Sequence, residues 1–234
     1  MKKIKFISLL TLVLGLASCE KTITFYQEDD RFVLEENALE SPQDVQELLN
    51  SVYDVEANFL GGQLQNLGEL LADGLSNPAG RNDDYTQIYN RRTDFFNGTI
   101  DGVYRDAYIA IYRANTLLES VDGVPGVDEA FSQRVKAESQ FVRALNHYMV
   151  VRLFAQPYVP NSSNTQLGII VKTNTDYQPL PRNTVNEVYD AILADLIKVK
   201  SSLPTENGIY ATSWAAKALL AKVYLEMGNT DSAY

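Results

Sequence analysis

The stretch KAESQFVRALNHYMVVRLF, residues 136–154, decides the fold. Its apolar residues recur every three or four positions, which is the spacing of a helix with one buried face. The pattern begins near Val127, and Gln156-Pro157 ends it because proline cannot donate the backbone hydrogen bond that a helix requires. We expect one long helix over 127–154, whose buried side carries Ala137, Phe141, Ala144, Leu145, Tyr148, Val151 and Leu153.

Further helices are expected on both sides of this segment. Ser41-Pro42 is typical of a helix start, with serine as the N-cap and proline at the first helical position. The connection 157–181 contains four prolines and a short apolar run, which predicts a long ordered loop with at most one brief strand. The sequence therefore predicts an all-α fold with long irregular loops, and with helices over 41–60, 64–71, 101–121, 127–154, 185–202 and 212–227.

The last of these segments has the spacing of a tetratricopeptide repeat, a pair of antiparallel helices of about 34 residues. The match covers the first helix and the turn, and it stops at the small residue that opens the second helix. A fold that stops there leaves an apolar face uncovered, so we expect a tetratricopeptide-like repeat fold that is truncated at its C-terminus. The alternative is an alanine-rich helix with a loose tail. The matching positions are Leu220, Ala221, Tyr224, Gly228 and Ala233.

The first twenty residues have the features of a bacterial lipoprotein leader. Lysines precede an apolar run, 6–16, that is shorter than the roughly 20 residues a membrane-spanning helix needs. Small residues then precede Cys19, the only cysteine of the chain, where a lipid would be attached. The alternative is an ordinary signal peptide that contains a cysteine. We expect a removable leader over 1–18, a lipidated tether over 19–40 and a helical domain over 41–234.

The charge of the chain limits its partners. The formal net charge is −10, and removal of the three leader lysines makes it −13. An acidic protein does not seek the phosphates of nucleic acids or the surface of anionic lipids, so we expect no nucleic-acid partner. Membrane attachment then depends on the lipid at Cys19 alone.

The sequence offers little for catalysis. His147 is the only histidine, it lies within the long helix, and no second histidine or cysteine of the helical domain can share a metal with it. No phosphate-binding loop, dinucleotide fingerprint, nucleophile elbow or zinc-protease motif is present. We therefore expect no metal and no cofactor. A pair of carboxylates for glycoside hydrolysis stays open, because acidic residues are numerous.

The loop 73–97 is the candidate ligand site. It gathers aromatic and polar side chains outside any clear helical period. Flat aromatic rings stack on the C–H faces of sugars, while Arg, Asn and Asp bind hydroxyl groups in pairs. The alternative is that Phe95 and Phe96 pack the loop onto the helices. The predicted ligand-binding residues are Arg81, Asn82, Tyr85, Phe96 and Asn97.

Four segments together resemble one family. Residues 108–119 resemble its "Y-x-x-I-x-R-A-N" helix, and residues 136–154 resemble its "AE-x-x-F-x-RA-x-x-Y-x-x-x-x-LF" helix. Pro181–Asp190 and Thr212–Leu225 match the helices that follow. In order and spacing, and with a lipid-attachment motif in front, the mature chain resembles the SusD/RagB family of Bacteroidetes outer-membrane lipoproteins.

This resemblance implies a helical binding protein, not an enzyme, anchored by lipid to the outer membrane and facing the cell exterior. Such proteins cap a SusC-like TonB-dependent transporter and capture nutrients, usually glycans and sometimes peptides. The family often places an aromatic residue and an asparagine just before the first motif helix. Phe96 and Asn97 are the nearest counterparts here, with Phe in place of the more usual Trp. The alternatives are an envelope scaffold that binds only proteins and an exported glycosidase.

Overall fold

The computed structural model describes residues 39–76 and 83–233. The predicted leader 1–18, Cys19 and nearly all of the tether 19–40 lie outside the described residues, as do Arg81 and Asn82. Residues from Leu39 onward cluster as one unit. Its elements are α2 (Pro42–Leu60), α3 (Gln63–Leu71), α4 (Asp84–Tyr89), α5 (Gly98–Ser120), the 3-10 turn η2 (Val121–Gly123), α6 (Glu129–Phe154), α7 (Val185–Val199), α8 (Ser213–Glu226) and α9 (Thr230–Ala233).

The expected all-α fold is confirmed. Within the described ranges there is no strand, and the only β contact is the isolated bridge between Leu167 and Thr184. Side-chain caps set the starts of the helices. Ser41 accepts a hydrogen bond from Asp44 N at the start of α2, and Thr184 forms a reciprocal capping box with Glu187 at the start of α7.

Two helix starts differ from the expectation. Helix α4 lies in a segment that was predicted to be irregular, and Asp83 caps it by accepting from Thr86 N at 2.8 Å. Helix α5 begins at Gly98, three residues before the predicted start, because Asn97 caps it. The six residues of α4 are too few for a helical period to be visible. The start of α5 is set by the Asn97 cap rather than by apolar spacing.

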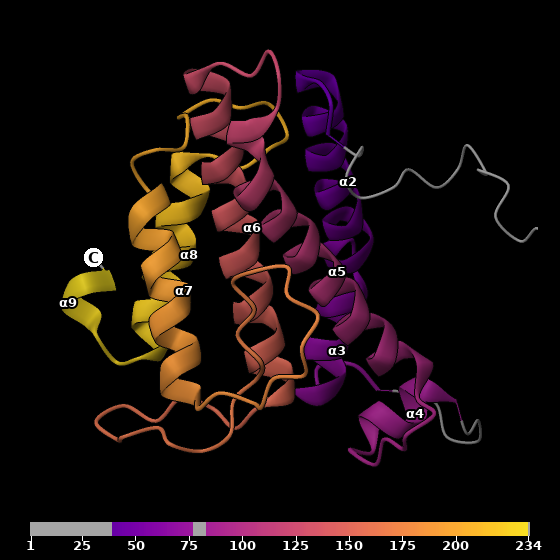
Figure 1. Cartoon of the computed structure of the whole chain (residues 1–234). Coiled ribbons are helices and arrows are strands. Elements are labelled where there is room, and N and C mark those ends of the chain that lie inside the picture. The colour runs from indigo at the N-terminus through magenta and orange to yellow at the C-terminus, as the bar shows by residue number, and fades with distance from the viewer. Residues whose placement is uncertain (1–38, 77–82, 234) are drawn as a thin grey trace, which may run out of the picture. The chain divides into compact units, whose positions relative to one another are not determined.

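Helix α6 is the centre of the fold (Figure 1). It packs against α5 on one side and α7 on the other, while α2 packs on α5 and α8 packs on α7. The sequence predicted one buried side for this helix. In the structure most of its length is buried all round, because neighbouring helices cover the polar side as well. The buried polar residues of α6 include Glu138, Gln140, Arg143, Asn146 and His147.

Several buried polar side chains of α6 form hydrogen bonds to α2 as well as within α6. Glu138, which is fully buried, accepts hydrogen bonds from Tyr53 Oη at 2.6 Å and from Arg134 at 2.7 Å. Asn146 donates from its amide to Glu56 on α2 and to the Val142 carbonyl. Burial raises the pKa of Glu56 to about 7, and Glu56 Oε2 and Asn146 Oδ1 have no partner. These contacts join α2 to α6.

The connection between α6 and α7 is ordered by backbone contacts at its two ends. Gly168 N donates to Asn183 O at 2.7 Å, and Asn183 N donates to Ile169 O at 2.8 Å. A Cβ atom at Gly168 would lie 2.9 Å from Val188 Cγ2, so only glycine allows this close approach. The predicted long ordered loop is present, and its brief strand amounts to one bridge.

Helices α8 and α9 form the helix–turn–helix that the repeat spacing predicts. Gly228 makes the turn with a φ of +75°, a conformation that glycine adopts at little cost. Helix α8 leaves Trp214 64% exposed and Leu225 61% exposed. None of the described helices is long and apolar enough to span a lipid bilayer.

Candidate functional site

An exposed aromatic pair precedes α5. The side chains of Phe95 and Phe96 are 93% and 87% exposed, and their rings meet edge to face, with centroids 5.5 Å apart. The alternative that these rings pack the loop onto the helices is therefore wrong. Exposed adjacent Phe rings are unusual on a protein surface and are typical of a binding surface.

A compact set of hydrogen bonds holds this pair in place. Asp94 Oδ1 accepts from Phe96 N at 2.8 Å, and Gln87 Nε2 donates to Asp94 Oδ2 at 3.1 Å. Asn97 Oδ1 caps α5 by accepting from Ile100 N at 3.1 Å. Its amide donates to Asp84 O at 3.1 Å and to Gln87 Oε1 at 3.0 Å. The loop is thus fixed to both α4 and α5, although its two phenyl rings are in solvent.

A polar hollow lies on the same segment. Thr86, Gln87, Asn90 and Arg92 line it, and its volume is about 490 Å³. Gln87 belongs both to this hollow and to the hydrogen-bonded support of the Phe pair. Gln87 therefore connects the hollow to the residues that flank the Phe pair. Aromatic rings can stack on a sugar ring, and amide and guanidinium groups can bind its hydroxyl groups.

The predicted ligand-binding residues differ in how exposed their side chains are. Phe96 is exposed, and Tyr85 on α4 is 40% exposed. Asn97 is only 2% exposed, and its amide oxygen and nitrogen both bond within the fold, so capping accounts for it without a ligand. Ligand binding by these residues stays a prediction. The sequence did not single out Gln87, Asn90 or Arg92, although the three-residue spacing of Gln87 and Asn90 places them on one helix face.

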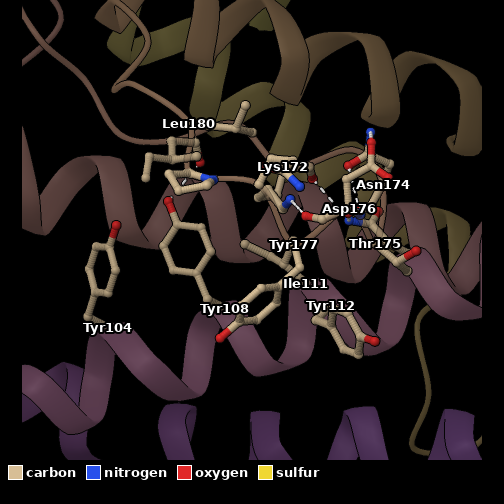
Figure 2. A pocket seen from close by; sticks show the side chains of 14 residues that line it. Tyr104, Tyr108, Ile111, Tyr112, Lys172, Asn174, Thr175, Asp176, Tyr177 and Leu180 are labelled. Atoms are coloured by element: carbon tan, nitrogen blue, oxygen red, sulfur yellow. Dashed lines mark hydrogen bonds between the residues drawn. The ribbon is translucent and has the colours of Figure 1, made fainter. Parts of the chain in front are cut away.

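A second concave site lies between α5 and the loop that follows α6. Its volume is about 350 Å³. Figure 2 shows Tyr104, Tyr108 and Tyr112 in a row on α5, opposite the loop segment that runs from Lys172 to Leu180. The floor is apolar, because Ile111 is 1% exposed. The other lining residues are Asn115, Ile170, Asn174, Thr175, Asp176, Tyr177, Gln178 and Pro179.

A buried ion pair positions that loop. Arg143 on α6 donates to both carboxylate oxygens of Asp195 on α7, at 2.8 and 2.7 Å. The same guanidinium donates to Asn115 Oδ1 at 2.8 Å and to Thr173 O at 3.2 Å. Asn115 in turn donates to the carbonyls of Lys172 and Asn174. Three helices and the loop therefore meet at one guanidinium.

Two more side chains attach the loop to the helices. Tyr108 Oη donates to Ile170 O at 2.7 Å, and Lys172 N donates to His147 Nε2 at 3.2 Å. Burial and the nearby Arg143 lower the pKa of His147 to about 3, so the ring is neutral and can accept this bond. Burial raises the pKa of Tyr108 well above its usual range.

His147 is thus accounted for as a structural acceptor. Within 39–76 and 83–233, no cluster of His, Cys, Asp and Glu could hold a metal ion. The residues that fix the pocket include Asn115 and Arg143, which stand in the sequence only as positions of the two motif helices. Their partners Asp195 and Thr173 lie 52 and 30 residues further along the chain from Arg143, a separation that local patterns do not reveal.

Comparison with known proteins identifies relatives over most of the chain. A family model named SusD-like, described as "Starch-binding associating with outer membrane", matches residues 27–225. "SusD-like protein P2" of Formosa agariphila is 28% identical over 237 residues, covering 99% of this chain and 44% of that protein. The chain therefore spans about half the length of the curated relatives it matches.

Solved structures give the same relationship. The crystal structure of a SusD superfamily protein from Bacteroides thetaiotaomicron has a TM-score of 0.69 and 25% identity, over 83% of this chain and 44% of that one. A structure described as "Laminarin binding SusD-like protein" has a TM-score of 0.65 and 24% identity, over 83% of this chain and 42% of that one. At 24% identity, the similarity to the laminarin-binding protein shows a shared fold and does not show a shared ligand.

Proposed function

Because the chain belongs to the SusD-like family of starch-binding proteins that associate with the outer membrane, we propose that it captures glycans at the surface formed by Phe95, Phe96 and the neighbouring polar hollow. The observation that carries this proposal is the exposure of the two Phe rings, 93% and 87%. Rings that contact each other but otherwise remain in solvent are available to stack on a sugar.

The support of the ring pair favours binding over a passive surface role. Asp94 accepts hydrogen bonds from Phe96 N and Gln87 Nε2, and Asn97 Nδ2 donates to Gln87 Oε1, so the loop is fixed before any ligand arrives. A preformed loop loses little conformational entropy on binding, so more of the contact energy appears as affinity. Arg92 and Asn90 in the hollow supply hydrogen bonds to hydroxyl groups beside the rings.

The proposed role is capture without chemistry. The polar groups of the hollow are amide, hydroxyl and guanidinium groups, which bind hydroxyls but do not act as the paired carboxylates of a glycosidase. We expect a bound glycan to be released unchanged. Recovery of shortened oligosaccharides after prolonged incubation with the purified chain would instead favour the glycosidase alternative.

Affinity electrophoresis in gels that contain laminarin, starch or another neutral polysaccharide tests the binding proposal. Laminarin is included because one structural neighbour is described as binding it. The expected result is retarded migration in at least one gel, with the dissociation constant raised about tenfold or more by Phe95→Ala/Phe96→Ala. A matched control is Ile209→Ala, a 91% exposed apolar side chain elsewhere. Unretarded migration across a broad panel would refute glycan capture.

We further infer that Cys19 carries a lipid and that captured glycan passes to a SusC-like TonB-dependent transporter. The basic, apolar and small-residue order before Cys19 supports the first part, and the description of the family as associating with the outer membrane supports both. Cys19→Ala should move the protein from the membrane to the soluble fraction of the producing cells. Affinity purification of the natural chain from solubilised outer membranes should recover the transporter. Equal membrane association of Cys19→Ala contradicts the anchor.

A further inference from the structure

The pocket between α5 and the loop 170–180 has a chemistry that differs from that of the Phe95–Phe96 surface. Its walls are rings and aliphatic groups: the tyrosines of α5 lie on one side and Leu180 of the loop on the other (Figure 2). Ile111 and Pro179 also line the pocket. Tyr177 is 97% exposed and Leu180 is 43% exposed, so part of this apolar surface is available at the rim.

The polar groups of the pocket are largely committed to the fold. Asn174 bonds to Asp176 through both ends of its amide, with Oδ1 accepting from Asp176 N and Nδ2 donating to Asp176 Oδ2. Thr175 Oγ1 donates to Glu119 at 2.6 Å, and Lys172 Nζ donates to Asp176 O.

The deeper groups are committed as well. Asn115 is fully buried and bonded to Arg143 and to two loop carbonyls. Tyr108 Oη donates to Ile170 O. A sugar ring in this pocket would lose water from its hydroxyl groups and find few partners in return, which disfavours a saccharide.

The volume points to a small ring system. An apolar cavity of about 150 Å³ accepts one benzene molecule, so the 350 Å³ of this pocket suits roughly two fused rings. Two aromatic rings gain an attraction from edge or offset stacking beyond the burial of their area, and a saturated ring lacks the second π system that this pairing needs.

We propose that this pocket is a second binding site, selective for an aryl group and separate from the surface at Phe95 and Phe96. The aryl group can belong to a free aromatic compound or to an aromatic side chain of a peptide. Both sources present the same flat apolar face to Tyr104, Tyr108 and Tyr112. The proposal does not depend on glycan capture, since it rests on a different set of residues.

Titration calorimetry of the whole chain with 2-naphthol, and with its saturated analogue decahydro-2-naphthol, tests the proposal. The two probes have the same carbon skeleton and hydroxyl group. We expect saturable one-site binding of 2-naphthol, with the saturated analogue at least about threefold weaker. Absence of saturable binding at millimolar 2-naphthol, or equal binding of both probes, overturns the proposal.

Variants locate the binding. Tyr112→Ala/Tyr177→Ala removes two side chains that are 41% and 97% exposed, so the fold should persist, as a circular dichroism melt can verify. This variant should weaken 2-naphthol binding about tenfold, whereas Phe95→Ala/Phe96→Ala should change it less than twofold. Unchanged affinity in the tyrosine variant, or loss in the Phe variant, places the probe elsewhere and overturns the proposal.

A third titration identifies the source of the aryl group. The probe is the capped peptide acetyl-Gly-Phe-Phe-Gly-amide, in competition with 2-naphthol. Displacement of 2-naphthol by the peptide assigns the pocket to aromatic side chains. Binding of 2-naphthol without displacement assigns it to free aryl compounds. Both outcomes support an aryl site, and failure of both probes to bind overturns it.

Discussion

Phe95 and Phe96, just before α5, are supported differently from Tyr104, Tyr108 and Tyr112, which lie on that helix. The Phe pair is held by hydrogen bonds among residues 83–100, all close in sequence. The tyrosine pocket needs a loop about 60 residues away, which is fixed through Arg143 on α6. The first region is a local structure with exposed rings, and the second exists only when the whole helical unit is packed.

This contrast has a consequence for how the two sites respond to change. Substitution of the residues buried around α6 should affect the pocket and the stability of the fold together. Perturbing the Phe pair should affect its ligand while the fold remains.

Replacing Arg143 with Leu should give the largest effect. The change leaves the Asp195 carboxylate buried without its cation. It also removes the guanidinium that donates hydrogen bonds to Asn115 Oδ1 and to Thr173 O. Breaking a buried ion pair from one side costs about 3–5 kcal/mol, so the free energy of unfolding in urea should fall by that amount. The control Arg105→Leu removes an arginine that is 61% exposed and should cost less than about 0.5 kcal/mol. A loss below about 1 kcal/mol for Arg143→Leu would contradict the central position of this residue.

Glu56 tests whether the buried contact between α2 and α6 holds a neutral acid. Its pKa is about 7 in the fold because of burial, against 4.5 for the ordinary side chain. As the pH rises from 4.5 to 7, the unfolded chain releases this proton while the folded chain retains it, so the fold loses stability.

Glu56→Gln imitates the neutral acid at every pH. We expect the variant and the natural chain to be equally stable at pH 4.5, and the variant to be more stable at pH 7 by about 3 kcal/mol. Chemical denaturation at several pH values gives this difference directly. A difference in stability that does not depend on pH would show that Glu56 is already ionised in the fold.

Asn97→Ala should give an effect of intermediate size in the local region. Loss of the N-cap of α5 costs about 1 kcal/mol of stability, and it also removes the bonds to Asp84 and Gln87 that fix the Phe pair. Glycan affinity should therefore fall. Thr212→Ala removes the equivalent cap from α8 and serves as the matched control, with a similar loss of stability and unchanged glycan affinity. If Asn97→Ala and Thr212→Ala bind glycan with equal affinity, the Asn97 cap does not contribute to the glycan site.

Phe96→Ala should have the smallest effect on stability. The ring is 87% exposed, so the free energy of unfolding should change by less than about 0.5 kcal/mol while glycan retention is reduced. Thermal melts and affinity gels on the same preparation measure both quantities. A loss of stability above about 1 kcal/mol would mean that Phe96 packs in the fold and would remove the contrast between the two regions.

Much of the helical framework was predictable from the sequence. The apolar period of 127–154 and the prolines after it predicted α6 to within two residues at its start and correctly at its end. Helix α4 was missed, since six mixed polar and aromatic residues show no period. Phe96 was identified as a candidate ligand residue, while its neighbour Asn97 proved to be a buried helix cap.

The positions of the long helices follow from the amino-acid sequence alone, because apolar periods, caps and prolines act over a few residues. The resemblance of residues 108–119 and 136–154 to family motifs also marked Asn115 and Arg143 as motif positions. The roles of Asn115 and Arg143 depend instead on the packing of the helices. Their partners are a carboxylate on α7 and backbone carbonyls in a loop that becomes adjacent only when α5, α6 and α7 pack together. Exposure of the Phe pair was likewise a tertiary outcome, because burial depends on what neighbouring helices cover.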